Sequence, residues 1–265
     1  MKLTTSQLKR IIKEELDSEK QQIMRLLKEP DHVNQGIEFW RQLFPNEPLK
    51  AELKGMLGNK NTVVDAIEIW HNLFPRERLP MEGADLQGAD LQGVSLQRAI
   101  LYKANLIRAN LQGADLEGAR LYEAHLIRAT LHYANLEGAN LTRAILLEAD
   151  LQEADLRGAF LYGADLRGAN LIGAQLYRAD LEGAQLEGVS LQGAKFEGAN
   201  LREANLREAK LQDANLQGAD LRKANLIGAD LRGADLEGAY LIRAILYGAK
   251  FEGANLREAN LREAK

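Results

Sequence analysis

Residues 84–98 read Ala-Asp-Leu-Gln-Gly, Ala-Asp-Leu-Gln-Gly, Val-Ser-Leu-Gln-Arg, which is three five-residue units in a row. The pattern continues without an insertion to the end of the sequence, with a large apolar residue at every fifth position from Leu86 to Leu261. This position is called i. It is Leu in 34 of the 36 units, and position i−2 is Ala in 34. Position i−1 is usually Asp or Asn, and i+2 is Gly in 19 units.

A five-residue period fits neither regular secondary structure. Successive leucines on an α-helix would be rotated by about 140° and scattered around the cylinder. In a β-strand, a five-residue step would send each leucine to the opposite face. A chain that turns once every five residues places i−2 and i inside, while i−1, i+1 and i+2 face water. We therefore expect short extended segments joined by corners, because Gly and polar residues at the corner positions fit turn chemistry.

The unit resembles the pentapeptide-repeat family, whose consensus is Ala-(Asp/Asn)-Leu-x-x, and the resemblance covers residues 79–265. It implies a β-solenoid: a right-handed quadrilateral β-helix with four repeats per coil, which gives about nine coils from 36 repeats. At the strand spacing of ~4.8 Å, these coils make a rod roughly 40 Å long. Residues twenty apart then become neighbours in successive coils, and the inward leucines and alanines form ladders.

The abundant aspartates do not form a catalytic pattern. Asp85 occupies i−1, and Asn105 fills the same position elsewhere. General acid–base catalysis needs the ionisable group, so this interchange favours side-chain hydrogen bonds to nearby backbone amides. The glycines recur at fives and not as a GxGxxG phosphate loop. His125 and His132 fall on neighbouring walls of the predicted coil, and neither has a histidine beside it. We expect no enzyme, no metal site and no cofactor.

Composition removes several other classes. The 265-residue chain has no cysteine, which excludes disulfides and thiolate metal sites. No stretch approaches the ~20 apolar residues of a membrane span, and the N-terminal residues lack the apolar core of a signal peptide. An apolar share of 46% is ordinary for a folded chain. We expect a cytoplasmic protein without a membrane partner.

Residues 1–78 lack the five-residue pattern and predict a small α-helical domain before the β-helix at 79–265. Apolar residues at helical spacing indicate four helices, near 4–28, 34–44, 48–57 and 62–74. The segment 37–45 aligns with 67–75 at an offset of thirty residues, which indicates an internal duplication. No known family is identified for this domain.

Each copy of the duplication carries aromatic residues on one helical face, Trp40 with Phe44 and Trp70 with Phe74. Two roles compete for the domain. As a cap, it would cover a β-helix end, where unpaired strand edges and apolar rungs are exposed. As a recognition module, it would offer these aromatic residues as anchors for a partner. We favour the cap, because a tryptophan on an apolar helical stripe usually belongs to the core.

Coil stacking also gathers apolar residues on two neighbouring walls of the predicted rod. A stripe lies in its first third, and a smaller group recurs near the end. The candidate interface residues are Ile100, Tyr102, Ile107, Tyr122, Ile127, Leu147 and Tyr162 in the stripe, and Tyr240, Ile242 and Tyr247 in the second group. Contiguous exposed apolar patches usually mark interfaces. The occupant is either the helical domain folded back on the rod, or a partner or second copy of the chain.

These patterns favour a non-enzymatic interaction or scaffold protein whose protein partner is unknown. Some members of the resembled family imitate duplex DNA and bind DNA gyrase, which gives a second hypothesis. A DNA-like rod of ~40 Å would carry more than about twenty charges, at one per ~1.7 Å. Residues 81–265 carry 21 basic and 26 acidic side chains, a net charge of −5, which disfavours the mimic. We expect no direct nucleic-acid binding, because no basic stripe stands out. The uncovered last coil is a candidate for self-association, since unpaired edges tend to pair.

Overall fold

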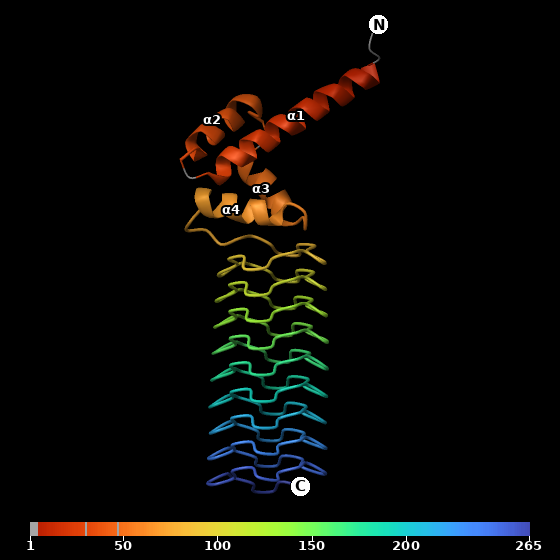
Figure 1. Cartoon of the computed structure of the whole chain (residues 1–265), viewed down its shortest axis with the longest axis vertical. Helices are drawn as coiled ribbons and strands as arrows, with labels where there is room; N and C mark the ends of the chain where they lie inside the picture. The colour runs from red at the N-terminus through yellow and green to blue at the C-terminus, as the bar shows by residue number, and fades with distance from the viewer. Residues whose placement is uncertain (1–4, 30, 47) are drawn as a thin grey trace. The chain divides into compact units, whose positions relative to one another are not determined.

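The computed structural model describes residues 5–29, 31–46 and 48–265, with side chains from residue 13 onward within these ranges. Thr4, the expected start of the first helix, lies outside the described residues. The chain divides into two compact units, Met1–Glu77 and Arg78–Lys265. The first holds helices and the second a stack of coils (Figure 1).

The first unit contains helices α1 (Thr5–Lys28), α2 (Val33–Leu43), α3 (Leu49–Leu57) and α4 (Val63–Leu73). Their ends lie within one residue of the four expected helices. Helix α1 packs against α2 and α4, and α3 packs against α4. The small α-helical part of the predicted fold is therefore confirmed.

The duplication in the first unit extends further back than the segment visible in the sequence. Buried residues of α1 and α3 correspond at the same offset of thirty: Ile23 with Leu53, and Leu27 with Leu57. Gly36 of α2 lies against α1, where an added Cβ would be 2.9 Å from Leu27 Cδ2. The unit is thus two copies of a helix–turn–helix, α1–α2 and α3–α4.

In the second unit, each repeat pairs with the repeat one coil later through a parallel bridge between i−1 residues twenty apart. The N–H of Leu86 donates to the carbonyl of Asn105, and the N–H of Asn105 donates to the carbonyl of Ala84, both at 2.8 Å. Four repeats therefore make one coil, and the 36 repeats make nine. The four sides of this stack are called walls below.

Each corner of a coil is a four-residue turn. The N–H of Ala89 donates to the carbonyl of Leu86 at 3.0 Å, and the third residue of the turn, Gly88, has a φ of +66°. Positive φ confined to the third residue is the pattern of a type II turn. Every i+2 residue adopts it, with φ between +54° and +75°. This backbone explains the frequent glycine, because a side chain there costs roughly 1–2 kcal/mol.

Side chains at i−1 tie the corners and coils together. Asp85 Oδ1 accepts the N–H of Gln87 at 3.4 Å and the side-chain amide of Asn105 at 2.9 Å. Asn105 Oδ1 in turn accepts the N–H of Ile107 at 3.3 Å. The same Asp–Asn pairing between coils recurs on the other three walls. The expectation that these residues serve local backbone amides is confirmed.

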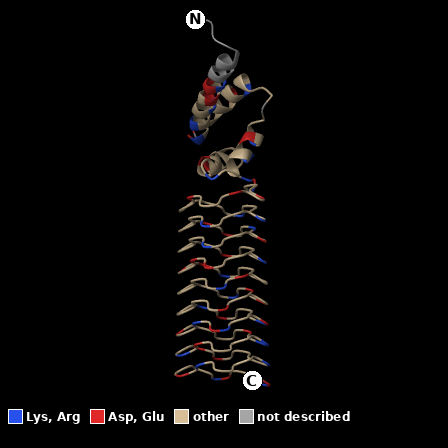
Figure 2. Cartoon of the chain, turned by 90° about the vertical axis from the view of Figure 1, so that its right-hand side faces the viewer, with Lys and Arg blue, Asp and Glu red and all other residues tan. Residues whose placement is uncertain are grey.

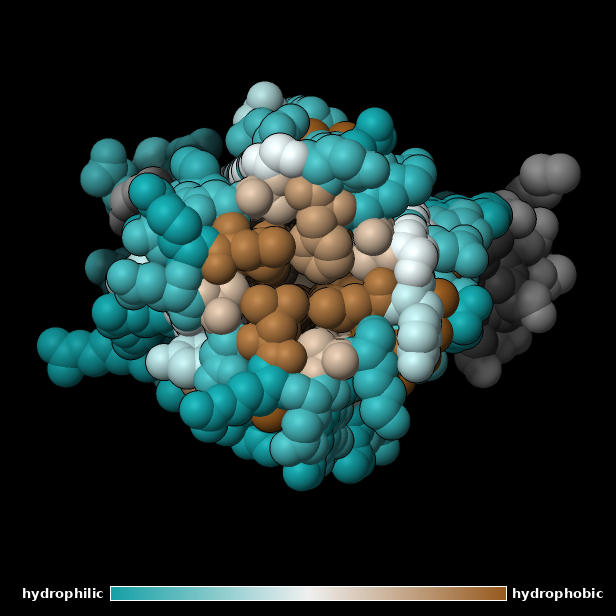
Figure 3. Space-filling model, turned by 90° about the horizontal axis from the view of Figure 1, so that it is seen from below, coloured by the Kyte–Doolittle hydropathy of each residue, from teal (hydrophilic) through white to brown (hydrophobic). Residues whose placement is uncertain are grey.

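The interior is a set of leucine and alanine ladders. Every residue at i from Leu86 to Leu241 is at most 1% exposed. In the last coil, Leu246, Phe251 and Leu256 are only half-buried and Leu261 is 38% exposed. Figure 3, which looks onto this coil, shows an apolar centre within a polar rim. Self-association through the last coil remains a prediction.

Candidate interaction surface

The candidate residues of the first coils form two columns whose members are twenty residues apart. They are the tyrosine column (Tyr102, Tyr122, Thr142 and Tyr162) and, on the next wall, the aliphatic column (Ile107, Ile127 and Leu147). The rings of Tyr102 and Tyr122 stack, with centroids 5.5 Å apart and planes 18° apart. This stacking leaves most column members half-buried, whereas Tyr162 is 48% exposed.

A groove of about 530 Å³, called the aromatic groove below, runs beside the tyrosine column. Its volume is within the usual range for ligand-binding clefts. One side is formed by Tyr102 and Tyr122, and the other is low because it carries the glycines Gly118 and Gly138. Its floor is an i−1 column, with Glu82 at one end of the groove. The floor residues are Ile100, Arg120, Asn140 and Phe160.

The structure thus adds three residues to those singled out in the sequence: Arg120, Asn140 and Phe160. Phe160 is 51% exposed, which makes it one of the most exposed large apolar residues of the described chain. Their signal is weak in the linear sequence, because nineteen residues separate each from the next. Comparing i−1 residues at intervals of twenty would have found them beside Ile100.

Charged side chains flank the tyrosine column. Lys103 Nζ lies 4.8 Å from the ring centroid of Tyr102 and 3.4 Å from Glu123 Oε2. Interaction with Tyr102 and then Glu123 raises the pKa of Lys103. Hydrogen bonding to Tyr122 and then to Lys103 lowers the pKa of Glu123. Arg143 donates to the Tyr122 hydroxyl at 3.5 Å. These contacts hold the tyrosine rings in place beside the groove.

The second apolar group lies at the other end of the coil stack. Tyr240 and Tyr247 are 49% and 61% exposed, and Ile242 is half-buried. Ile227 lies one coil before Tyr247, whose carbonyl accepts the N–H of Gly228 at 2.9 Å. This group has exposed aromatic residues, but the nine residues that line the groove include none of its members.

Acidic and basic side chains alternate along the corners. At i+2 positions twenty apart, Lys103 pairs with Glu123, and Arg243 Nε lies 2.7 Å from Glu263 Oε2. Within single repeats, Asp165 pairs with Arg167 at 2.6 Å. Figure 2 shows red and blue interspersed along the coils. Opposite charges this close cancel one another's field, so the stack has no long row of unpaired carboxylates among the described residues.

The four aromatic residues of the first unit lie largely in its core. Trp40 is 2% exposed, Phe44 is 6% exposed and Trp70 is 1% exposed, while Phe74 is half-buried. Each tryptophan packs on its phenylalanine, with ring centroids 4.9 and 4.8 Å apart. Trp40, Phe44 and Phe74 also line an apolar hollow of about 520 Å³.

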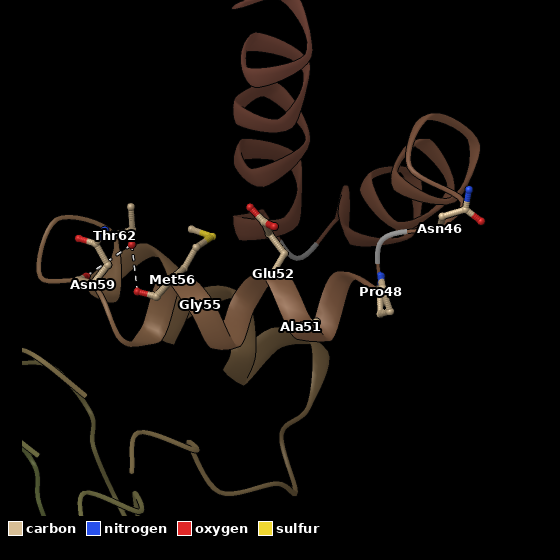
Figure 4. A pocket seen from close by; sticks show the side chains of 8 residues that line it. All are labelled: Asn46, Pro48, Ala51, Glu52, Gly55, Met56, Asn59 and Thr62. Atoms are coloured by element: carbon tan, nitrogen blue, oxygen red, sulfur yellow. Dashed lines mark hydrogen bonds between the residues drawn. The ribbon is translucent and has the colours of Figure 1, made fainter. Parts of the chain in front are cut away.

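A further hollow of about 460 Å³ lies along α3 (Figure 4). Glu52, which lines it, pairs with Lys20 at 3.6 Å. At its other end, Thr62 Oγ1 donates to the carbonyl of Met56 at 2.9 Å. These polar groups hold the helices and turns together.

The histidines of the coil stack do not converge on a metal site. His132 stacks on Tyr133 with ring centroids 4.0 Å apart, and His125 is exposed on the neighbouring wall. Across the described ranges, no group of three or more His, Asp or Glu side chains is arranged to hold a metal ion. In the same part of the chain, no helix is both long and apolar enough to cross a membrane.

Comparison with known proteins matches this geometry to one family. The family model for pentapeptide repeats matches residues 81–118, 109–146, 144–183, 184–222 and 224–263. The chain belongs to the pentapeptide-repeat family. The predicted fold, a right-handed quadrilateral β-helix with a small helical part before it, is therefore confirmed.

A solved pentapeptide-repeat structure supports the assignment. HetL, a pentapeptide repeat protein involved in heterocyst differentiation regulation from the cyanobacterium Nostoc sp. Strain PCC 7120, is 37% identical. The match covers 75% of this chain and 93% of HetL, with a TM-score of 0.57. No curated protein matches the chain.

Two other pentapeptide-repeat structures are more distant. One, from the Arabidopsis thaliana thylakoid lumen, is 36% identical over 36% of this chain and 63% of its own, with a TM-score of 0.30. QnrB1, a plasmid-mediated fluoroquinolone resistance protein, is 20% identical over 71% of this chain and 91% of its own, with a TM-score of 0.35.

Proposed function

We propose that this protein is a non-enzymatic scaffold and that the aromatic groove, together with the aliphatic column, binds a protein partner. The observation that carries the proposal is the groove itself: stacked tyrosines, an exposed phenylalanine and an arginine on one wall. Tyrosine, phenylalanine and arginine are enriched at protein interfaces relative to the rest of a surface.

The backbone makes this wall a suitable binding surface. Each repeat is hydrogen-bonded to the coils on both sides, so the groove is formed before a partner arrives. A preformed surface loses less conformational entropy on binding than a flexible loop does. HetL, the relative described above, is involved in the regulation of heterocyst differentiation. Regulation through contact with another protein is consistent with a surface of this kind.

An enzyme and a DNA mimic have less support. The polar groups of the hollow along α3 serve its own fold, and the groove combines no nucleophile with a base. A DNA mimic needs rows of carboxylates, whereas here neighbouring carboxylates pair with arginine or lysine, as Asp220 does with Arg222 and Glu203 with Lys223 at 2.8 Å. These pairs weaken the negative field that would attract a DNA-binding protein.

The test compares two double variants of the full chain as affinity baits in an extract of the source organism. Tyr122→Glu with Ile127→Glu adds charge to the groove and the aliphatic column. Gln112→Glu with Gln152→Glu adds the same charge at half-buried i+1 positions of another wall. We expect a protein captured by the wild type to be retained by the Gln variant and lost from the Tyr–Ile variant. Equal capture by both variants would overturn the proposal.

Hydrogen exchange of the free wild type and both variants separates a partner site from an internal contact. If the helical unit folded onto this wall, the Tyr–Ile variant would speed exchange in residues 5–77. The proposal requires unchanged exchange in those residues. It also requires an unchanged melting temperature of the coil stack, which shows that both variants fold.

A further inference from the structure

The aromatic groove has a feature that specifies its occupant, and the inference rests on the proposed function. We propose that the groove binds an extended segment of a partner protein with the pattern apolar–x–acidic–x–apolar. The central carboxylate lies between Arg120 and Asn140, and the two apolar side chains lie at Ile100 and Phe160. The pattern follows from a gap in the ladder of i−1 side chains.

On each wall, at least one asparagine at i−1 donates its side-chain amide to an aspartate one coil earlier, as Asn200 does to Asp180 at 2.9 Å. Asn140 has Arg120 at that position instead. Asn140 Oδ1 accepts the N–H of Thr142 at 3.0 Å, which leaves its Nδ2 atom as a donor. An arginine side chain has no acceptor. The Nδ2 of Asn140 therefore has no hydrogen-bond acceptor among the described residues.

Arg120 is exposed and forms no ion pair within the described part of the chain. Glu123, three residues after Arg120, is already paired with Lys103 at 3.4 Å. Glu82 is the acidic residue that lines the groove, and it lies in the tyrosine column one coil before Tyr102. Two donor groups thus stand side by side at the centre of the floor. A carboxylate from a ligand would supply the acceptor that an aspartate supplies elsewhere in the ladder.

The spacing of the floor fits an extended chain. Ile100 and Phe160 are three coils apart, which is about 14 Å at ~4.8 Å per coil. In an extended segment, side chains on one side repeat every ~6.6 Å, so three of them span about 13 Å. The outer two then meet Ile100 and Phe160, and the middle one falls between Arg120 and Asn140. The stacked rings of Tyr102 and Tyr122 cover the segment from the side.

The low glycine edge admits such a segment. Gly118 and Gly138 leave the floor open toward the preceding wall, and no heavy atom lies within 4 Å of a Cβ built at Gly138. At Gly118, the nearest atom to such a Cβ is Cγ of Arg98 at 3.5 Å. Arg98 therefore lies beside Gly118 on this edge, while the exposed Arg120 is the cation that lines the centre of the floor. Charge complementarity favours an acidic centre over a basic or neutral one.

The test measures fluorescence anisotropy of labelled nine-residue peptides with the full-length protein. The acidic peptide is Gly-Ser-Leu-Ser-Glu-Ser-Leu-Ser-Gly, and the neutral and basic peptides carry Gln or Lys in place of Glu. A fourth peptide has Ser in place of both Leu. We expect the acidic peptide to bind about twofold to fivefold more tightly than the neutral one, because an exposed charge pair contributes up to about 1 kcal/mol.

A charge exchange then locates the contact. Arg120→Glu should lower the affinity for the acidic peptide at least tenfold, so that the basic peptide binds more tightly than the acidic one. The matched control is Lys210→Glu, which makes a similar charge change at an exposed i−1 position of another wall; it should leave both affinities unchanged. The peptide without leucines should not bind, since the apolar ends are then lost.

Three results would overturn the inference: no binding of the acidic peptide, equal binding of the acidic and basic peptides, or equal effects of the two protein variants. A dimer that Tyr122→Glu dissociates in analytical ultracentrifugation would also overturn it, because the occupant would then be a second copy. If the acidic peptide does not bind, but capture of a partner protein is still lost in the Tyr122 and Ile127 variant, the proposed function stands and only the motif is wrong.

Discussion

Enlarging Ala154 tests whether the small residue at i−2 packs tightly inside the coil. Its side chain is 0% exposed, and its backbone is fixed on both sides. Its N–H donates to Leu151 at 3.0 Å, and its carbonyl accepts the N–H of Gln175 at 2.9 Å. Leucine at this position adds three carbon atoms between alanines that lie ~4.8 Å away in the neighbouring coils. The backbone cannot move apart without breaking these bonds, so Ala154→Leu should cost about 3 kcal/mol, the upper part of the usual range for overpacking.

The comparison variant is Leu156→Met, which keeps the volume of a residue that is also 0% exposed and should cost under about 1.5 kcal/mol. Thermal melts followed by circular dichroism at two scan rates give the order of the melting temperatures. For a unit of this size, 1 kcal/mol corresponds to roughly 2–4 °C, so Ala154→Leu should melt about 6–12 °C below the wild type. If Leu156→Met melts below Ala154→Leu, the assignment of i−2 as the tightly packed inward position is wrong.

Four further measurements check other features of the molecule. Gly138→Ala should lower coil-stack stability by about 1 kcal/mol in urea unfolding; the cause is backbone strain at a φ of +63°, since the added Cβ meets no atom within 4 Å. The control is Gly55→Ala in α3, where the added Cβ also has free space but the backbone is helical, so this change should be stabilising. Stability changes of the same sign in both variants would contradict the strain argument. The hydrogen bond from Arg232 lowers the pKa of Asp230 from 3.8 to about 2. The ionised Asp230 carboxylate therefore contributes its full stabilisation above about pH 4, and this stabilisation is lost as the pH falls through 2. The stability difference between wild type and Asp230→Asn should therefore shrink over that interval, and a constant difference would exclude the ion pair as its source. Arg243→Ala should change stability by under about 1 kcal/mol, because both partners of its pair with Glu263 are exposed; a larger loss in urea unfolding would show that the corner charges stabilise the stack. Equimolar full-length protein should leave DNA gyrase supercoiling unchanged, and inhibition would restore the DNA-mimic hypothesis.

The sequence predicts the coil stack well because one spacing determines both the burial and the corner geometry. Leu and Ala at i and i−2 can be buried together only if the chain turns every five residues. The turn then requires positive φ at i+2, where Gly is frequent. The helices were also predictable, because Trp40 and Trp70 follow the same spacing in both copies of the duplication.

The aromatic groove was harder to predict because it depends on residues that lie twenty positions apart. The apolar columns were visible, since tyrosines recur at Tyr102, Tyr122 and Tyr162. The groove floor was not, because Arg120 and Asn140 resemble ordinary surface residues in the linear sequence. Their significance depends on the missing acceptor at Arg120, and that absence is meaningful only once the Asp–Asn pairing of the other walls is known.

The twenty-residue register of the bridges also limits how such a chain can change length. Gain or loss of a whole coil keeps every later residue on its own wall. Loss of a single repeat turns all the following residues by a quarter of the circumference, which would separate Phe160 from Ile100 and place a different set of side chains beside it. Growth of this rod by duplication can therefore preserve a recognition site only in steps of four repeats.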